Sequence, residues 1–415
     1  MRFLIIFCSV VLTCYLGVGI FNVIVDPYQQ YEFVTVKNFN ENKPTVSNHV
    51  RLYKADMVTR IKPQTIIIGN SRCDTGLSPN YLGWENKPVY NMSLPSATIY
   101  EIRRYVEHAH SVRPLKHIVL CLEDIMFASK KYNPGFSEDN LNLNVNGGKN
   151  WGAWLHRLSY MFSFGGTMDS IKTIRQQDEI TAYSELGQRK YDWWLKKTNS
   201  WGGVHNLFNK VERSKMKGLL DAFKKDPDFL TRNSDQVGFE HYRSLLKTAY
   251  RDNIKLTIVI TPSHARLEEI RRTFSPAIKS INAIVKDIIK INEQISSSMS
   301  KDAFIIYDFS GYNDFTTEKV PEKLSEDLMN WYWEVAHFKA ELGDVILDRI
   351  FSKKTDVTSS DFGMKLTSEN IQKHFSNKIN ARLKYQEEFA GDILELKQLV
   401  PAYFEEAIKQ KYNAQ

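Results

Sequence analysis

The feature of this chain that most restricts its fold is an uncharged, apolar run from Phe3 to Val25. As an α-helix the run is about 34 Å long, which is enough to cross a hydrocarbon core about 30 Å thick. A cleaved signal peptide has a shorter apolar region and an Ala-x-Ala-like site. The sequence therefore predicts an uncleaved transmembrane anchor over residues 1–25. Because Arg2 marks the inner side and no domain precedes the run, we expect the main domain to be extracytoplasmic, either periplasmic or extracellular.

The composition is that of an ordered protein with a sizeable core. The chain is 42% hydrophobic and 25% charged, which excludes a disordered or collagen-like protein. Its formal net charge of +7 is a small excess of 55 basic over 48 acidic residues, and no long Lys/Arg run occurs. The sequence thus predicts no nucleic-acid partner. With scattered histidines and no CxxC spacing, it also predicts no metal site and no cofactor.

Two of the four cysteines, Cys8 and Cys14, fall inside the predicted anchor. The other two, Cys73 and Cys121, belong to the exported part, where the compartment allows a disulfide. The sequence leaves two alternatives open, a bridge between them or two buried free thiols.

Short apolar runs alternate with segments of helical periodicity. The runs predict five strands, at residues 65–69, 88–91, 117–122, 255–261 and 303–307. This alternation predicts an α/β fold with a mainly parallel, doubly wound sheet. In such sheets ligands bind beyond the carboxyl ends of the strands. The polar residues at those ends are Asn70, Ser71, Asn91, Asp124, His264 and Asp308.

The strand pattern is interrupted once and followed by an extension. Residues 26–128 and 236–351 are predicted to form the two halves of the α/β domain, and residues 129–235 a helical insertion that holds five of the eight tryptophans. These tryptophans form either the core of a small subdomain or an exposed platform for sugar rings.

Residues 352–415 are predicted to be a helical C-terminal extension, with Ile393, Leu396, Leu399 and Tyr403 at helical spacing. The extension either packs on the domain, pairs with a partner or stays mobile.

The residues with catalytic potential are Ser71, Glu334 and His337. Ser71 directly follows a predicted buried strand, so its hydroxyl would be presented at the edge of the sheet beside free backbone N–H groups. In Glu334-Val-Ala-His337 the acid can hold one ring nitrogen while the other accepts the serine proton. The ordinary alternatives are a turn with a helix cap at Ser71 and an (i, i+3) helical pair of Glu334 and His337.

These blocks, in this order, resemble a known family. Ile66-Ile-Ile-Gly-Asn-Ser71-Arg, then Val89-Tyr-Asn-Met-Ser93, an acid after the third strand at Asp124, and the late acid-x-x-His before residues 343–347 are similar to the SGNH/GDSL hydrolase superfamily. The likeness extends over about residues 26–350. Within the superfamily, the chain more closely resembles the membrane-anchored, extracytoplasmic branch, which includes proteins similar to the alginate O-acetylation and teichoic-acid D-alanylation proteins.

The resemblance implies a flavodoxin-like three-layer sandwich that acts on acyl esters, often of a surface carbohydrate. It implies that Ser71 is the nucleophile, His337 the general base and Glu334 the orienting acid. Glu334 stands where the family usually has Asp, and Asp327 and Asp308 are the alternative acids.

The predicted oxyanion donors also depart from the family, which uses a Gly after the second strand and an Asn after the third. This chain has Asn91 and Ser93 at the first place and Glu123 with Asp124 at the second. A carboxylate next to an oxyanion is repulsive, and loss of one donor typically removes about 10²–10³ in rate. Either Asn91 and the amides of Ser71 and Ser93 supply the donors, or the site is slow or inactive.

Three further residues are candidates for substrate contact. Arg72 could neutralise an anionic substrate, although a salt-bridged arginine is the ordinary alternative. Asp124 and His264 end strands at the same edge of the sheet, and His264 could equally be a hydrogen-bonded loop histidine.

Together these features predict a membrane-anchored serine acyltransferase or esterase that passes an acyl group to a polysaccharide hydroxyl or to water. Its expected partners are the membrane, a polysaccharide or glycan substrate and a candidate membrane-bound acyl-donor protein. The alternative is a non-catalytic SGNH-like protein that binds glycan or supports an assembly through its tryptophan-rich insertion.

Overall fold

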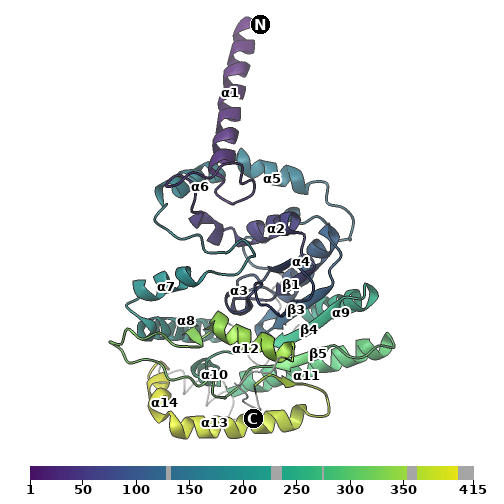
Figure 1. The fold of residues 1–415 in the computed structure, drawn as a ribbon, viewed down its shortest axis with the longest axis vertical. Helices are drawn as coiled ribbons and strands as arrows, with labels where there is room; N and C mark the ends of the chain where they lie inside the picture. Colours follow the sequence, from purple (N-terminus) through teal and green to yellow (C-terminus); the bar gives the residue numbers. More distant parts are fainter. Residues whose placement is uncertain (128–131, 226–235, 273–274, 353–361, 401–415) are drawn as a thin grey trace.

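A six-stranded, mostly parallel sheet organises the domain in the computed structural model, which describes residues 1–127, 132–225, 236–272, 275–352 and 362–400 (Figure 1). The strands run in the order β2-β1-β3-β4-β5-β8. Their bounds are β1 Thr65–Ile68, β2 Val89–Asn91, β3 His117–Leu122, β4 Lys255–Ile260, β5 Ile305–Asp308 and β8 Met364–Lys365. The first five strands are parallel, and β8 pairs antiparallel with β5. The predicted α/β class with a mostly parallel sheet is therefore confirmed.

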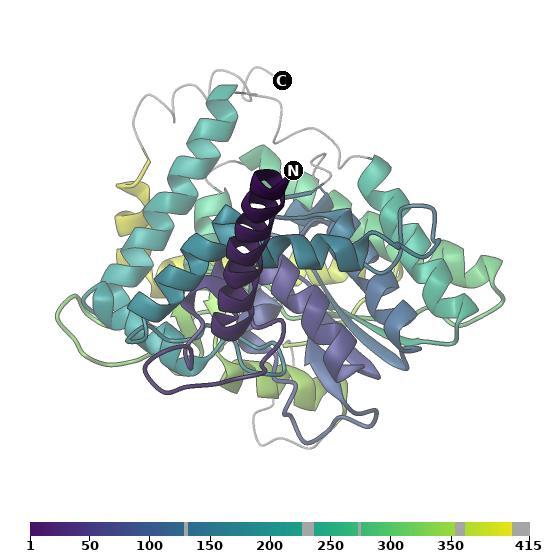
Figure 2. The same ribbon diagram turned by 90° about the horizontal axis from the view of Figure 1, so that it is seen from above.

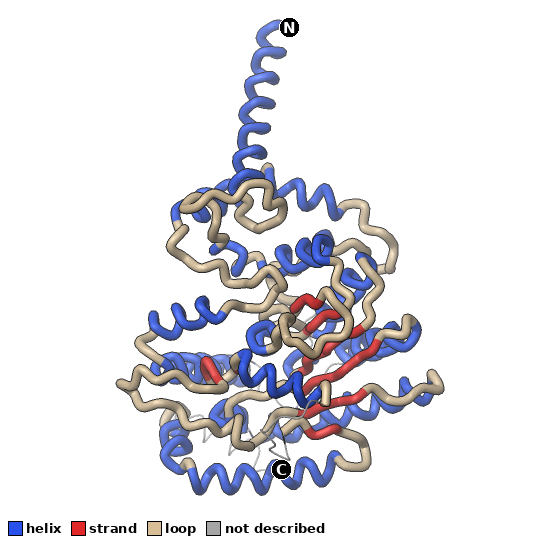
Figure 3. Tube along the Cα trace, viewed as in Figure 1, coloured by secondary structure: helices blue, strands red, loops and turns tan. Residues whose placement is uncertain are grey.

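Helices cover both faces of this sheet, as Figure 3 shows. In β3, Ile118 and Leu120 belong to the hydrophobic core on one face, whereas Val119 and Cys121 belong to the core on the other. The strands read as continuous apolar runs because both of their faces are buried.

The helices of the first face are α2 Val50–Ile61, α4 Ile99–Val112, α9 Gln236–Arg251 and α11 Ser275–Ser298. The second face is covered by α3 Ser71–Gly76, α8 Val204–Lys225, α10 Ala265–Arg272, α12 Ala340–Ile350 and a hairpin of β6 Tyr332–Glu334 and β7 His337–Phe338.

A disulfide between Cys73 and Cys121 joins α3 to β3, with 6.6 Å between the two Cα atoms. Both cysteines are fully buried. Of the two alternatives that the sequence left open, the structure has the bridge.

The segment between β3 and β4 contains the short 3-10 helices η2 Asp124–Phe127 and η3 Glu138–Asn140, followed by α5 Ala153–Met161, α6 Phe164–Arg175, α7 Tyr191–Ser200 and α8. Its tryptophans do not share one environment. Trp194 is buried, whereas Trp151 and Trp154 are 70% and 55% exposed. The tryptophans of the insertion therefore do not form one common hydrophobic core.

Residues 371–397 pack on the domain as α13 Ile371–Glu388 and α14 Ala390–Lys397. Asp308, at the end of β5, accepts hydrogen bonds from His374 Nε2 at 2.8 Å and from Lys378 Nζ at 2.6 Å, both on α13. Asp308 is therefore engaged away from His337. Tyr403 lies outside the described residues.

The chain begins with α1 Arg2–Val25, which projects from the domain and is long and apolar enough to cross a membrane (Figure 1). From Arg2 to Val18 its residues are exposed. After α1, the short 3-10 helix η1 Pro44–Ser47 leads to α2.

Removing the disulfide should destabilise the domain. The bridge closes a loop with a sequence separation of 48 residues, and disulfides typically contribute about 2–4 kcal/mol by restricting the unfolded chain. We expect the Cys73→Ala/Cys121→Ala variant to lose about this much unfolding free energy in urea titrations of the full chain in detergent micelles. The matched control is Cys8→Ala/Cys14→Ala, which changes the two exposed cysteines of α1. Equal stability of the two double variants would contradict a structural role for the bridge.

Candidate functional site

Ser71 is placed at the carboxyl edge of the sheet by the turn between β1 and α3. β1 ends at Ile68, and Ser71 is the first residue of α3. The side chain of Asn70 caps this helix, because its Oδ1 accepts a hydrogen bond from the Arg72 amide at 3.0 Å. The Ser71 amide is one of the first N–H groups of the helix, which have no partner within it.

The hairpin of β6 and β7 brings a histidine and an acid to this serine. His337 Nε2 lies 2.8 Å from Ser71 Oγ, and His337 Nδ1 is hydrogen-bonded to the carboxylate of Glu334. The other carboxylate oxygen of Glu334 accepts a hydrogen bond from the Ala336 amide at 2.9 Å. The structure thus joins the three residues in one chain of hydrogen bonds. It excludes the helical alternative, because Glu334 and His337 lie on paired strands.

Glu334 is held in its charged form. Burial raises the pKa of this carboxyl, but the His337 ring and the Ala336 amide outweigh burial, so that the pKa lies below its usual value. A buried carboxylate beside Nδ1 orients the imidazole and stabilises a positive charge on it.

Close backbone contact fixes α3 against the elements that carry the histidine. Gly343, on α12, approaches Gly76 so closely that a Cβ atom there would lie 1.7 Å from the Gly76 carbonyl oxygen. A Cβ atom on Gly76 would lie 1.9 Å from the ring of Phe338, the residue after His337. The helix of Ser71 therefore cannot shift relative to His337 without moving α12.

Ser71 and His337 open into a common pocket of about 330 Å³. Ile125, Leu219 and Leu267 supply apolar lining, and Lys215 and Arg271 supply basic groups. This volume lies at the lower end of the range of ligand pockets, about 300–1,000 Å³.

Asn91 and Ser93 are turned away from this pocket. The side-chain amide of Asn91 donates to the carbonyl oxygens of Cys73 at 2.7 Å and Leu77 at 2.9 Å, near the end of α3. The Ser93 amide donates to Asn91 Oδ1 at 3.1 Å. The expectation that Asn91 and Ser93 provide oxyanion donors is therefore corrected. Asn91 instead binds the carbonyl end of the helix that carries Ser71.

The carboxylate of Glu123, expected to repel an oxyanion, is neutralised. It pairs with Arg72 Nε at 3.0 Å and accepts a hydrogen bond from the side-chain amide of Asn70. Arg72 is buried, and its Nη1 also lies 3.5 Å from the carbonyl oxygens of Thr261 and Pro262. These contacts agree with the alternative of a salt-bridged arginine.

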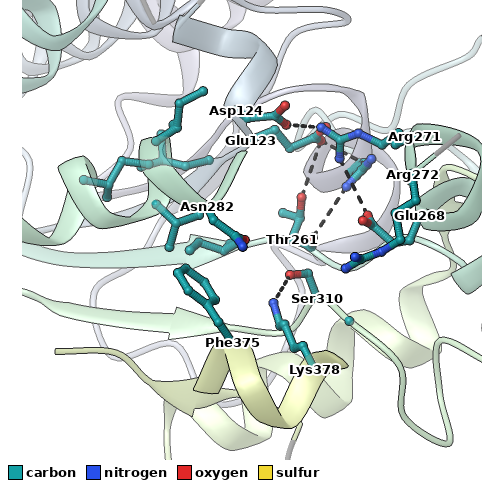
Figure 4. A pocket seen from close by; sticks show the side chains of 17 residues that line it. Glu123, Asp124, Thr261, Glu268, Arg271, Arg272, Asn282, Ser310, Phe375 and Lys378 are labelled. Atoms are coloured by element: carbon teal, nitrogen blue, oxygen red, sulfur yellow. Dashed lines mark hydrogen bonds and ion pairs between the residues drawn. The ribbon is translucent and has the colours of Figure 1, made fainter. Parts of the chain in front are cut away.

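Asp124 and His264 also have other partners. Figure 4 shows Asp124 directed at Arg271, with which it forms an ion pair, in a smaller neighbouring pocket of about 70 Å³. His264 is buried and bonds the Glu318 carbonyl oxygen at 2.7 Å. Burial lowers the pKa of His264 to about 4. His264 is therefore a hydrogen-bonded loop histidine, as in the second of the two alternatives.

The sequence did not indicate that Trp194 belongs to the site. Its ring centroid lies 5.1 Å from that of His337, and it stacks on Trp333 at 5.9 Å. The adjacent pair Trp193-Trp194 was visible in the sequence, but no spacing related it to a histidine more than a hundred residues later. Trp194 covers one side of the imidazole and limits its movement.

No protein-family model and no curated protein matches this chain. Among the residues that the structure describes, no group of three or more His, Cys, Asp or Glu side chains is placed to hold a metal ion.

Because α3 and α12 are in backbone contact, one methyl group added at Gly343 should strongly destabilise the fold. Gly343→Ala has to separate the two helices, and we expect it to cost more than the ~1–3 kcal/mol typical of overpacking. Gly218→Ala is the matched control, because a Cβ atom at this position of α8 meets nothing within 4 Å. This control should gain about 0.5–1 kcal/mol. Thermal unfolding of both variants measures the difference, and an unchanged midpoint for Gly343→Ala would contradict the described packing.

Proposed function

We propose that this protein is a membrane-anchored serine enzyme of SGNH type that acts on acyl esters of a cell-surface or exported polysaccharide. The observation that carries the proposal is the hydrogen-bonded chain from Ser71 Oγ through His337 to Glu334. In the proposal Ser71 is the nucleophile, His337 the general base and Glu334 the orienting acid. Such a triad is recognised by its geometry and not by the positions of its residues in the sequence.

The sheet supports the same proposal. The order β2-β1-β3-β4-β5 is that of flavodoxin-like sheets, and helices cover both faces, as in a three-layer sandwich. Ser71 lies where such sheets bind ligands, beyond the carboxyl end of a strand.

In the proposed reaction, His337 Nε2 takes the proton of Ser71 while Oγ attacks the ester carbonyl carbon. The tetrahedral intermediate collapses when the protonated His337 donates that proton to the departing alkoxide oxygen, which leaves an acyl-Ser71 ester. His337 then deprotonates a sugar hydroxyl or a water, whose oxygen attacks the acyl carbon. Collapse of this second intermediate returns the proton through His337 to Ser71 Oγ.

The backbone amide of Ser71, at the start of α3, would donate a hydrogen bond to the oxyanion. A full oxyanion hole has at least two donors, and each is worth about 10²–10³ in rate. Since Asn91 and Ser93 are engaged elsewhere, we propose that the substrate-bound enzyme acts with fewer donors than the family usually has. Neutralisation of Glu123 by Arg72 removes the charge that would oppose this step.

Transfer to a glycan is the preferred outcome over hydrolysis. α1 would hold the domain next to glycans exported across the membrane, in an extracytoplasmic compartment that agrees with the buried disulfide. Trp194, which lies beside His337 and stacks on Trp333, would limit the access of water to the base.

A second candidate function is a non-catalytic SGNH-like protein that binds glycan or supports an assembly. The observation in its favour is the engagement of Asn91 by α3, because this removes a donor that the catalytic proposal would otherwise use.

Replacing the nucleophile separates the two functions. We expect Ser71→Ala to abolish both labelling by a fluorophosphonate probe and release of acetate from an activated ester, because Oγ is the attacking atom. Both are measured on the full chain in detergent micelles, and Ser310→Ala, at a serine bonded to Asp308, is the control. Equal turnover by Ser71→Ala and wild type would contradict the catalytic proposal. A folded wild type that is inert in both assays would favour the glycan-binding function.

The acid is tested by Glu334→Gln, which preserves size but removes the charge that stabilises the imidazolium. We expect kcat to fall by about 10²–10⁴, with little change in KM. Asp327→Asn is the matched control, since Asp327 is an exposed acid bonded to Ser325. If both variants retain wild-type kcat, Glu334 has no role in the chemistry.

A further inference from the structure

The last turns of α1 are not free, because the insertion docks against them. Gly19 faces the ring of Phe162 so closely that a Cβ atom would lie 2.2 Å from it. Asn22 donates to the Met161 carbonyl oxygen at 2.7 Å and accepts a hydrogen bond from Ser170 at 2.8 Å. α5 and α6 therefore form a platform at the base of α1.

The length of α1 places this platform at a bilayer surface. The exposed part of α1, from Arg2 to Val18, extends about 25 Å at ~1.5 Å per residue. A hydrocarbon core is about 30 Å thick, so this part alone falls about 5 Å short. A bilayer that covers the apolar length of α1 would therefore reach the level of Gly19 and Phe162.

α5 lies across the base of α1, which is the orientation of a helix in the plane of the membrane (Figures 1 and 2). One side of α5 faces the domain, since Arg157 forms an ion pair with Asp56 of α2 at 2.6 Å. Leu155, two residues earlier, points about 160° away from Arg157 and is 56% exposed. Leu155 is thus an uncovered apolar side chain on the side of α5 opposite the domain.

Four more apolar side chains extend this surface. Phe164, at the start of α6, is 81% exposed, and Met168 follows one turn later. Trp151 lies two residues before α5 and Trp154 in its first turn, and Lys149 Nζ lies 4.0 Å from the Trp151 ring centroid. We call Trp151, Trp154, Leu155, Phe164 and Met168 the interfacial patch. Exposed Trp, Leu and Phe with neighbouring Lys are typical of helices that lie in the headgroup region.

We propose that the interfacial patch inserts into the extracytoplasmic leaflet of the bilayer that α1 spans, so that the protein is held by one spanning helix and one surface-lying helix pair. Interfacial helices bury their apolar face about 5–10 Å deep, which matches the shortfall in the exposed length of α1. The inference does not depend on catalysis. Its consequence is that the domain cannot pivot freely about Asp26 and keeps a fixed orientation to the membrane.

The experiment uses the full chain in single-copy nanodiscs made with lipids brominated near the headgroup end of the acyl chain. We expect these lipids to quench part of the tryptophan fluorescence, and we expect Trp151→Phe/Trp154→Phe to lose most of that quenching. Trp201→Phe, at a half-exposed tryptophan after α7, is the control and should retain it. Leu155→Glu should also weaken quenching, whereas Leu394→Glu, an equally exposed leucine on α14, should not.

Two results would overturn the proposal. One is quenching that is unchanged in Trp151→Phe/Trp154→Phe. The other is free quenching of Trp151 and Trp154 by aqueous iodide in the nanodisc, which would leave the patch in water or available to a second copy of the chain. Both readouts are independent of Ser71, so failure here leaves the proposed enzyme activity untouched.

Discussion

The geometry of the site depends on the backbone contact between α3 and α12. Gly76 and Gly343 have no side chains, so the helix that begins with Ser71 packs directly on the helix that follows His337. The disulfide of Cys73 to Cys121 ties the same short helix to the centre of the sheet. Residues 266 positions apart in the sequence can therefore stay at a hydrogen-bonding distance of 2.8 Å, because neither helix can slide.

Buried charges around α3 are balanced by ion pairs. Asp74, on α3, pairs with Lys54 of α2, both side chains being fully buried, and also with Arg189 Nε at 3.2 Å. Burial lowers the pKa of Lys54 to about 8 although Asp74 raises it, so Lys54 stays mostly protonated at neutral pH. Arg72 and Glu123 repeat this arrangement at the pocket. Removing one partner of such a pair leaves a buried charge without compensation, which makes α3 intolerant of single changes on either side.

The sequence predicted the five parallel strands because both faces of each strand are buried and their runs are rich in β-branched residues. Ser71, His337 and Glu334 were found because each lies in a local pattern, a strand followed by Gly-Asn-Ser and an acid three residues before a histidine. The place of Asn91 could not be predicted, since its partners are carbonyl groups exposed only by the end of α3. The position of Trp194 over His337 depends on how the insertion folds back, which no local pattern encodes.

We propose that Ser71 forms an acyl ester with the help of His337. The most direct measurement is intact and peptide mass spectrometry of the full chain, quenched in acid shortly after mixing with an activated acetyl ester. We expect one acetyl group on the peptide that contains Ser71, and its absence in His337→Ala. Acetylation confined to other residues, or equal acetylation of Ser71 in His337→Ala, would contradict the proposal.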